Sequence, residues 1–281
     1  MNCQDKRGKH SCGDYHGMEG HPCFNKKAHH HVGRIHLPVA PKCNIKCNYC
    51  TRRHDCANEN RPGVTSRVLN PQQALEKVRQ AVTADPRIKV VGIAGPGDPL
   101  ANQQTLETFA LVHQEFPQLL KCLSTNGLML PSRIEELAEV GLNSLTVTVN
   151  TLDPEIGAKI YSWVRYQGQV LLGQEAAAQL IKNQLDGIAQ AVERGITVKV
   201  NTVFIPGIND QGIEKLAEKI KGLGVYIMNI MPLIPQAQFA HLIAPTPEEI
   251  SQVRAAYSPI IMQMEHCRQC RADAVGLIGS A

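Results

Sequence analysis

"RIHLPVAPKCNIKCNYC", residues 34–50, joins an apolar segment to a loop that carries three cysteines. Residues 34–40 have the composition of a β-strand, and Cys43, Cys47 and Cys50 then follow at intervals of four and three residues. A structural zinc site is closed by four ligands, whereas this loop supplies three. Three thiolates can also hold a cubane iron–sulfur cluster, which then keeps one iron open. A zinc loop or a set of free thiols is the alternative.

Strands and helices alternate regularly after this loop. The expected strands cover residues 34–40, 89–95, 121–127, 144–150, 197–204 and 226–233. The expected helices cover residues 70–82, 105–116, 132–141, a stretch from 154, 175–195, 212–224 and 246–257. Asn70 is the expected N-cap of the first helix, with Pro71 at its first position. Six strand–helix units with Val/Ile-rich strands predict an α/β fold, a partial or complete TIM-type barrel around a parallel sheet.

Length, charge and composition narrow the class of protein. The chain has 281 residues, a net charge of +4 and 4% aromatic residues, which gives no indication of nucleic-acid binding. It contains no apolar stretch of transmembrane length, and its first residues lack the apolar core of a signal peptide. These features predict a cytoplasmic protein with no membrane partner. In that compartment the ten cysteines are expected to bind metal rather than to form disulfides.

The cysteines concentrate outside the alternating region. Most lie near the start of the chain, and two lie near its end. This distribution predicts three regions: an N-terminal cluster-ligating extension over residues 1–32, the barrel over residues 33–257, and a C-terminal cluster-ligating tail over residues 258–281.

The spacing C-x-x-x-C-x-x-C after the first strand, with Tyr49 before the last cysteine, resembles the signature of the radical SAM superfamily. The resemblance extends from residue 35 to about residue 257. It implies a partial (β/α)6 barrel in which Cys43, Cys47 and Cys50 bind a [4Fe–4S] cluster. The open iron chelates the amine and carboxylate of S-adenosylmethionine (SAM), and one electron from the cluster releases a 5′-deoxyadenosyl radical.

The resemblance also implies where SAM binds. The glycine-rich stretch AGPGDPL (94–100) follows the second strand, where backbone groups approach the methionine ammonium closely. Amides at strand ends suit the ribose and the carboxylate, and an apolar side chain near the sixth strand suits the adenine. The implied SAM-binding residues are Tyr49, Gly95, Gly97, Asp98, Asn126, Asn150, Asn201 and Met231. The glycines and amides, taken alone, fit turn or capping roles equally well.

Three further motifs, GHPCFN (20–25), CANENRPG (56–63) and HCRQCRADAVG (266–276), resemble those of the nitrogenase cofactor biosynthesis family of radical SAM proteins. This resemblance spans nearly the whole chain. It implies an enzyme of lyase or transferase type that fuses two further [4Fe–4S] clusters into an eight-iron core. One SAM donates the methyl group that becomes a central carbide, and another supplies the radical that abstracts hydrogen from it. The product is the precursor of the nitrogenase cofactor.

The same resemblance implies two ligand sets for the substrate clusters. The first set corresponds to Cys23, His36 and Cys122. The second set corresponds to Cys56, Cys267 and Cys270. Few protein ligands per cluster leave irons exposed for coupling. His36 alternates with apolar neighbours and is expected to point into the barrel; a hydrogen-bonded strand histidine is the alternative.

Glu59, Arg61 and His21 lie in family motifs, which implies that they position clusters or accept protons. A structural ion pair between Glu59 and Arg61 explains those two residues equally well. The run HHH (29–31) is similar to a metal site, but a solvated loop is the favoured interpretation. Two cysteines near the N-terminus match no motif.

The implied partners besides SAM are cluster donor proteins, a cofactor carrier, an assembly scaffold and an electron donor such as ferredoxin. Many related proteins continue into a carrier-like domain, whereas this chain stops at Ala281. The product is therefore expected to pass to a separate carrier or to be held between the tails. Two alternatives remain: a radical SAM enzyme with auxiliary clusters that modifies a peptide or RNA, and a non-enzymatic iron–sulfur scaffold. Short loops argue against the first, and the SAM-type loops argue against the second.

Overall fold

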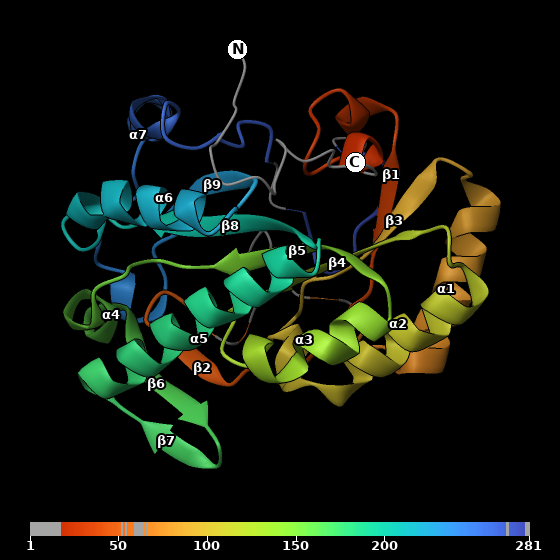
Figure 1. The fold of residues 1–281 in the computed structure, drawn as a ribbon, viewed down its shortest axis with the longest axis horizontal. Helices are drawn as coiled ribbons and strands as arrows, with labels where there is room; N and C mark the ends of the chain where they lie inside the picture. The colour runs from red at the N-terminus through yellow and green to blue at the C-terminus, as the bar shows by residue number, and fades with distance from the viewer. Residues whose placement is uncertain are drawn as a thin grey trace.

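A curved sheet of parallel strands forms the centre of the computed structural model (Figure 1). The structure describes residues 18–51, 53, 55–58, 65, 67–267 and 270–278. The strands of the main sheet are β1 (Gly33–His36), β3 (Ile88–Ile93), β4 (Leu120–Thr125), β5 (Leu142–Thr148), β8 (Thr197–Phe204), β9 (Ile227–Pro232) and β10 (Val275–Gly276). Their order is β10-β1-β3-β4-β5-β8-β9, with all neighbours from β1 to β9 in parallel. The sheet is open, with β10 and β9 at its edges, which confirms the predicted α/β partial barrel.

Helices connect the parallel strands and cover one face of the sheet. They are α1 (Pro71–Ala84), α2 (Gln103–Glu115), α3 (Leu130–Glu139), α4 (Pro154–Ile160), α5 (Gly173–Glu193), α6 (Ile213–Gly222) and α7 (Pro247–Tyr257). Short 3-10 turns lie at Met18–Gly20, Ala28–His30, Pro99–Ala101, Asp210–Gly212 and Ala237–Phe239. Asn70 Oδ1 accepts a hydrogen bond from Gln73 N at 2.9 Å, and the Gln73 side chain accepts one from Asn70 N at 3.1 Å. The predicted N-cap of α1 is therefore confirmed as a reciprocal capping box.

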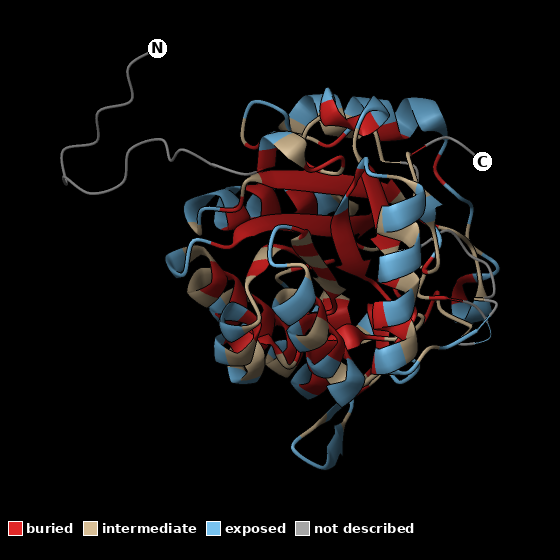
Figure 2. Ribbon diagram, turned by 90° about the vertical axis from the view of Figure 1, so that its right-hand side faces the viewer, coloured by how far each residue is buried: buried red, intermediate tan, exposed pale blue. Residues whose placement is uncertain are grey.

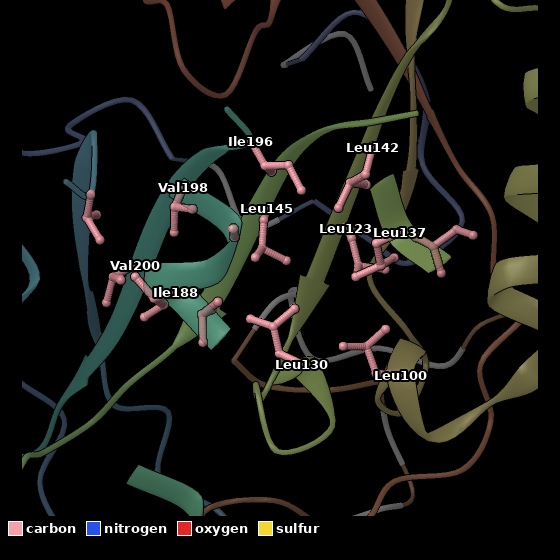
Figure 3. Packing of buried hydrophobic residues seen from close by; sticks show 14 of the residues in the cluster. Leu100, Leu123, Leu130, Leu137, Leu142, Leu145, Ile188, Ile196, Val198 and Val200 are labelled. Atoms are coloured by element: carbon pink, nitrogen blue, oxygen red, sulfur yellow. The ribbon is translucent and has the colours of Figure 1, made fainter. Parts of the chain in front are cut away.

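The strands are buried beneath the helices, and the helices expose their outer faces to solvent (Figure 2). Leu145, Val198 and Val200 pack against Leu130 and Ile188 of the covering helices (Figure 3). Such burial of aliphatic side chains is the main stabilising contribution to a sheet of this kind.

The opposite, concave face of the sheet is polar. Successive residues of a strand point to opposite faces. In β8, Val198 and Val200 pack beneath the helices (Figure 3), and Lys199 and Asn201 line a hollow on the other side. This alternation lines the barrel interior with polar side chains.

A second, antiparallel sheet was not predicted. It consists of β2 (Ile45–Cys47), β6 (Tyr161–Tyr166) and β7 (Gln169–Leu171) in the order β2-β6-β7. The helical stretch expected from residue 154 ends at Ile160, where the aromatic and β-branched run YSWVRY begins. Gln167 and Gly168, with φ values of 47° and 81°, form a two-residue turn between β6 and β7.

The C-terminal tail returns to the sheet as β10, antiparallel to β1. Arg34 Nη1 donates to the carbonyl oxygens of Gly276 at 2.5 Å and Leu277 at 3.1 Å. The sequence predicted a cluster-ligating tail over residues 258–281, and in the structure backbone pairing and this guanidinium hold its last described residues. Within the described residues, no helix combines the length and the apolar character required to cross a membrane.

Candidate functional site

The three-cysteine loop forms one wall of a hollow beyond the ends of β3 and β4. Cys43, Cys47 and Cys50 line this first hollow. Cys47 belongs to β2 and pairs with Tyr161 of β6, and Cys50 N donates to Cys47 O at 3.1 Å. Lys46 Nζ donates to the Cys50 carbonyl group. The second sheet thus fixes the backbone from which the three thiols extend.

The chemistry of this donor set fits a [4Fe–4S] cluster held by three thiolates. Cys47 is buried, and Cys43 and Cys50 are half-buried. Burial raises the pKa of the Cys47 thiol above its ordinary value, a penalty that a metal removes because it binds the thiolate directly. Among the described residues, no three His, Cys, Asp or Glu side chains converge to hold a single metal ion.

Tyr49, the aromatic residue before the last cysteine, is buried and braces the loop. Its hydroxyl donates to Asn58 Oδ1 at 2.5 Å and accepts from Asn150 Nδ2 at 2.7 Å. Asn150 also donates to the Tyr161 hydroxyl at 3.1 Å and accepts from Val203 N at 2.9 Å. Burial raises the pKa of Tyr49 well above its ordinary value, so the hydroxyl stays protonated. Asn150 supports the loop here, and its contact with SAM stays a prediction.

The glycine-rich loop after β3 packs against the segment that leads into the cysteines. Ala40 N donates to Gly95 O at 3.2 Å, Gly97 N donates to Ala40 O at 2.5 Å, and Asp98 N donates to Lys42 O at 2.8 Å. A Cβ atom at Gly97 would overlap the Lys42 carbonyl group. Any side chain at Gly97 would therefore force the two segments apart. Because Gly97 and Asp98 line the first hollow, this contact joins two of its walls.

Asp98 contributes a buried carboxylate to the first hollow. It accepts hydrogen bonds from the Thr125 hydroxyl at 2.9 Å and from the backbone N–H groups of Asn126 at 2.6 Å and Leu100 at 3.0 Å. Burial raises the pKa of Asp98 to about 6, and these donors oppose the rise. Asn126 also lines the hollow, where its Nδ2 donates to Asn44 Oδ1 at 2.7 Å. A carboxylate and an amide at this place suit the ammonium and polar groups of SAM.

A second hollow lies within the concave face of the sheet and adjoins the first. Its thiol and imidazole side chains are those of Cys23, His36, Cys122, His266, Cys267 and Cys270. Ser124 lines both hollows. Cys56, predicted to act with Cys267 and Cys270, lines the first hollow. The structure therefore brings one predicted ligand set together and divides the other between the two hollows.

A line of amide side chains joins the hollows. Asn201 and Met231, both predicted to contact SAM, line the second hollow. Asn201 Nδ2 donates to the backbone carbonyl of Asn58 at 3.1 Å, and Asn58 lines the first hollow. Asn229 Nδ2 donates to Asn201 Oδ1 at 3.1 Å. Asn201 thus connects a wall of the second hollow with a wall of the first.

His36 is oriented for ligation. Its Nδ1 lies 3.0 Å from the carbonyl oxygen of Arg271, which can only accept, so Nδ1 carries the proton and Nε2 keeps its lone pair. Burial lowers the pKa of His36 to about 4, so the ring is neutral at pH 7. Burial raises the pKa of Cys23 to about 12, an effect that the charge of Lys199 opposes. A neutral imidazole and a thiol that ionises on metal binding are suitable ligands for a cluster.

Of the three residues predicted to position clusters or accept protons, the structure describes only His21. Glu59 and Arg61 lie outside the described residues. His21 is buried, its Nδ1 accepts from Cys23 N at 3.1 Å, and its ring meets that of Phe24 edge-on at 4.7 Å. Burial lowers the pKa of His21 to about 3. His21 supports the Cys23 turn, and its role as a proton acceptor stays a prediction.

The histidine run at residues 29–31 is not wholly solvated. His29 is buried, and its ring contacts those of His30 and His266 edge-on, each at 5.2 Å. His30 and His31 are exposed. The prediction of a solvated loop is wrong for His29, because the C-terminal tail folds back and packs His266 against it.

Three polar residues of the site were not predicted. Asn58 bonds to Tyr49, Lys199 lines the second hollow, and Arg34 Nη2 lies 3.2 Å from Cys270 Sγ. The sequence does contain a signal for the two charged residues. Each lies within a short apolar strand segment, where an ion is costly unless it has a specific partner.

Comparison with known proteins identifies the superfamily and the fold. Residues 37–220 match the radical SAM superfamily. A radical SAM methyltransferase from Sphaerobacter thermophilus superposes with a TM-score of 0.57 over 83% of this chain and 64% of its own, at 20% identity. Methylornithine synthase superposes with a TM-score of 0.55 over 84% of this chain and 65% of its own, at 15% identity. These structures support the same curled α/β sheet.

Sequence relatives are much more similar. The FeMo cofactor biosynthesis protein NifB of Chlorobaculum tepidum is 48% identical over 93% of this chain, and the protein of that name from Methanocaldococcus jannaschii is 49% identical over 92%. The chain spans 62% of the first protein and 86% of the second, and 53% of the Azotobacter vinelandii protein of that name. The chain therefore belongs to the family of the FeMo cofactor biosynthesis protein NifB, within the radical SAM superfamily.

Proposed function

We propose that this chain is a radical SAM enzyme of FeMo cofactor biosynthesis that fuses two [4Fe–4S] clusters and inserts a carbide derived from the SAM methyl group. The observation that carries the proposal is the pair of adjoining hollows. One holds the three-cysteine loop, and the other gathers cysteines and histidines from both ends of the chain, with Ser124 lining both. A scaffold that only stores clusters has no need of the first hollow, and an enzyme acting on a polymer has no need of the second.

The resident cluster is assigned to Cys43, Cys47 and Cys50. When bound, it supplies the electron that cleaves SAM and releases a 5′-deoxyadenosyl radical. The walls of the first hollow provide the SAM site, in which the carboxylate of Asp98 attracts the methionine ammonium. Gly97 keeps the glycine-rich loop against the cysteine segment, so that the cosubstrate and the cluster share one cavity.

The second hollow is assigned to the iron–sulfur substrates. Cys23, His36 and Cys122 form one ligand set, all within this hollow. Cys56, Cys267 and Cys270 form the other, with Cys56 contributed from the first hollow. The use of few ligands for each substrate leaves irons exposed, which suits clusters that must couple. His36 is the ligand best suited to leave as coupling proceeds, because a neutral imidazole is a weaker ligand than a thiolate.

The proposed protein partners follow from these requirements. A reductant such as ferredoxin supplies the electron, cluster donor proteins supply the substrates, and a carrier or scaffold protein receives the product. The relatives' name supports this place in cofactor assembly.

The decisive test is isotopic. The anaerobically reconstituted chain is reduced in the presence of SAM labelled in its methyl group, and both 5′-deoxyadenosine and labelled iron–sulfur product are measured. We expect both in the wild type and neither in Cys43→Ala. In Cys122→Ala we expect 5′-deoxyadenosine without labelled product. Label in a peptide or RNA would support polymer modification instead, and intact SAM would leave only a scaffold.

A further inference from the structure

Strand β2 separates the first hollow from the outer side of the second sheet. Ile45 and Cys47 line the hollow, whereas Lys46, which lies between them, is paired with Trp163 of β6. Successive residues of a strand point to opposite faces, and residues paired across two strands share a face. Lys46 and Trp163 therefore lie on the side of the sheet that is turned away from the hollow, behind the wall that carries the three cysteines.

The β6–β7 hairpin extends this side away from the body of the molecule (Figure 1). Arg165 is paired with Val170 across the hairpin, and its guanidinium carbon lies 5.8 Å from the centroid of the Trp163 ring. Val170 is 53% exposed, and Leu172, two residues further along an extended backbone, is 62% exposed. We call Lys46, Trp163, Arg165, Val170 and Leu172 the outer face of the second sheet.

The other face of this sheet already has its packing partner. Val164 and Leu171 are paired across the hairpin and pack with Ala176 and Leu180 of α5 in one apolar cluster. Six large apolar side chains are exposed in the described part of the chain, and two of them belong to the outer face. Exposed apolar side chains that gather on one surface are typical of an interaction site. The sheet is thus held from its inner side, and its outer face is free to contact another molecule.

The composition of the outer face indicates what kind of molecule it contacts. Lys46 and Arg165 are basic, and the three strands of the sheet contain no aspartate or glutamate. Tryptophan and arginine are the residues most enriched at the centres of protein interfaces. Opposite charges on two proteins steer their association and determine its salt dependence. The outer face therefore suits a protein with an acidic surface.

The position of the outer face indicates what that protein does. Cys47 directly follows Lys46, and Lys46 Nζ donates to the Cys50 carbonyl group. The proposed SAM and iron–sulfur substrates occupy the two hollows, whereas an electron donor needs only to come close to the cluster. A donor on the outer face leaves both hollows open. Electron-transfer complexes are small, with interfaces of less than about 1,200 Å² in total, so a three-stranded sheet with a projecting hairpin is sufficient.

We propose that the outer face of the second sheet is the docking surface for the electron donor, an acidic iron–sulfur protein of the ferredoxin class. This inference rests on the proposed function. The donor places carboxylates against Lys46 and Arg165 and apolar side chains against Val170 and Leu172. In each transfer the reduced centre of the donor loses one electron and the cluster of the first hollow gains it, and no bond is made or broken in that step.

The test uses an acidic bacterial ferredoxin as the probe and compares the wild type with Arg165→Glu, Val170→Glu and Lys89→Glu. Lys89 is the matched control, because it is also an exposed cation of a strand but lies at the amino end of β3, whereas the three-cysteine loop lies beyond the carboxyl end. Binding of the oxidised ferredoxin to the metal-free full chain is measured by calorimetry at low and high salt. For the reconstituted chain, the KM for reduced ferredoxin is measured from 5′-deoxyadenosine formation, with dithionite as the reductant in parallel assays.

We expect the dissociation constant and the KM to rise at least about tenfold in Arg165→Glu and in Val170→Glu, which corresponds to about 1.4 kcal/mol. Lys89→Glu should match the wild type. Added salt should weaken the binding of the wild type more than that of Arg165→Glu, because salt screens the attraction between exposed charges. Rates with dithionite should be equal in all four proteins, since none of the changed residues lines either hollow.

Three results separate this inference from the proposed function. If ferredoxin bound the wild type and both outer-face variants equally, or did not bind the wild type, the docking surface would be refuted, and activity with dithionite would leave the proposed function intact. A dimer of the wild type that Val170→Glu dissociates would show that a second copy of the chain covers this face, and the inference would be wrong. If no protein formed 5′-deoxyadenosine with dithionite, the proposed function would fail, and the binding data would still decide whether ferredoxin docks here.

Discussion

Replacement of Tyr49 by phenylalanine tests whether the aromatic residue of the cysteine loop acts as a brace. The change removes one hydroxyl from a side chain that is 2% exposed. The ring remains, with its centroid 6.3 Å from that of Phe239, so the apolar packing is kept. The hydrogen bonds to Asn58 at 2.5 Å and from Asn150 at 2.7 Å are lost.

The expected cost follows from the two partners that remain. A hydrogen bond contributes about 1 kcal/mol net, and a buried polar group left without its partner costs about 1–3 kcal/mol. Asn150 retains its hydrogen bonds with Tyr161 and Val203, so the cost of losing its bond to Tyr49 lies at the low end of this range. Asn58 is buried and loses a short hydrogen bond, so its cost is higher. We therefore expect Tyr49→Phe to lower the free energy of unfolding by about 2–4 kcal/mol.

Urea unfolding of the metal-free protein, followed anaerobically by circular dichroism, measures this change. Tyr166→Phe is the matched control, since Tyr166 is half-buried in the β6–β7 hairpin, and it should stay within about 0.5 kcal/mol of the wild type. Asn58 Nδ2 also lies 3.9 Å from Cys47 Sγ, so the reconstituted variant should release iron faster. If the two phenylalanine variants were equally stable, Tyr49 would not brace the loop.

Three further predictions follow from the walls of the site. Gly97→Ala should cost about 2 kcal/mol of stability through overpacking against Lys42 and should weaken SAM binding, as measured by urea unfolding and equilibrium dialysis. Gly212→Ala, which meets nothing within 4 Å, should change neither, and equal behaviour of the two would contradict the close contact. Arg34→Met removes the donors to the tail carbonyls, so amide hydrogen exchange in β10 should become at least about tenfold faster; unchanged exchange would show that backbone pairing alone holds the tail. The pKa of Asp98 is raised from 3.8 to about 6, so the folded protein binds more protons than the unfolded chain between these values. The free energy of unfolding of the metal-free protein should therefore fall by up to about 3 kcal/mol as the pH rises through this window, and Asp98→Asn should remove that slope in a pH series of unfolding curves.

The sequence predicts the main sheet well because each strand and each helix cap is specified by residues that are neighbours in the sequence. Several central strands are rich in β-branched residues, as in KVVGI and TVKVNTVF, and this composition is typical of buried strands. Asn70 and Pro71 mark the start of α1 because the cap forms within one turn. The parallel order then follows from the alternation with helices.

The edges of the fold were not predictable in the same way. β2 and β10 have three and two residues, and their hydrogen bonds go to strands more than a hundred residues away in sequence. No local pattern specifies such a partner. The burial of His29 has the same origin, because the side chain that covers it, His266, comes from the other end of the chain.

The site shows the same division between local and long-range information. The place of the three cysteines on one wall of a hollow could be predicted because all three lie within eight residues. The hollow that Cys56 lines could not be predicted from spacing, because a contact between segments distant in sequence sets it. Cys56 N donates to Pro96 O at 2.9 Å, on the wall of the first hollow. Lys199 was not predicted as a residue of the site. A lysine in a strand indicates that its charge has a partner, but it does not identify that partner.

β4 explains why the two hollows are neighbours. Cys122 lines the second hollow, Ser124 lines both, and Asn126, just beyond the strand, lines the first. Residues two apart on a strand share a face and lie about 6.6 Å apart. The backbone of one central strand therefore sets a span of roughly 13 Å between a proposed substrate ligand and the SAM site. Because this spacing belongs to the backbone of a central strand, the proposed function requires no movement of a domain to bring reactive groups from the first hollow to a substrate in the second.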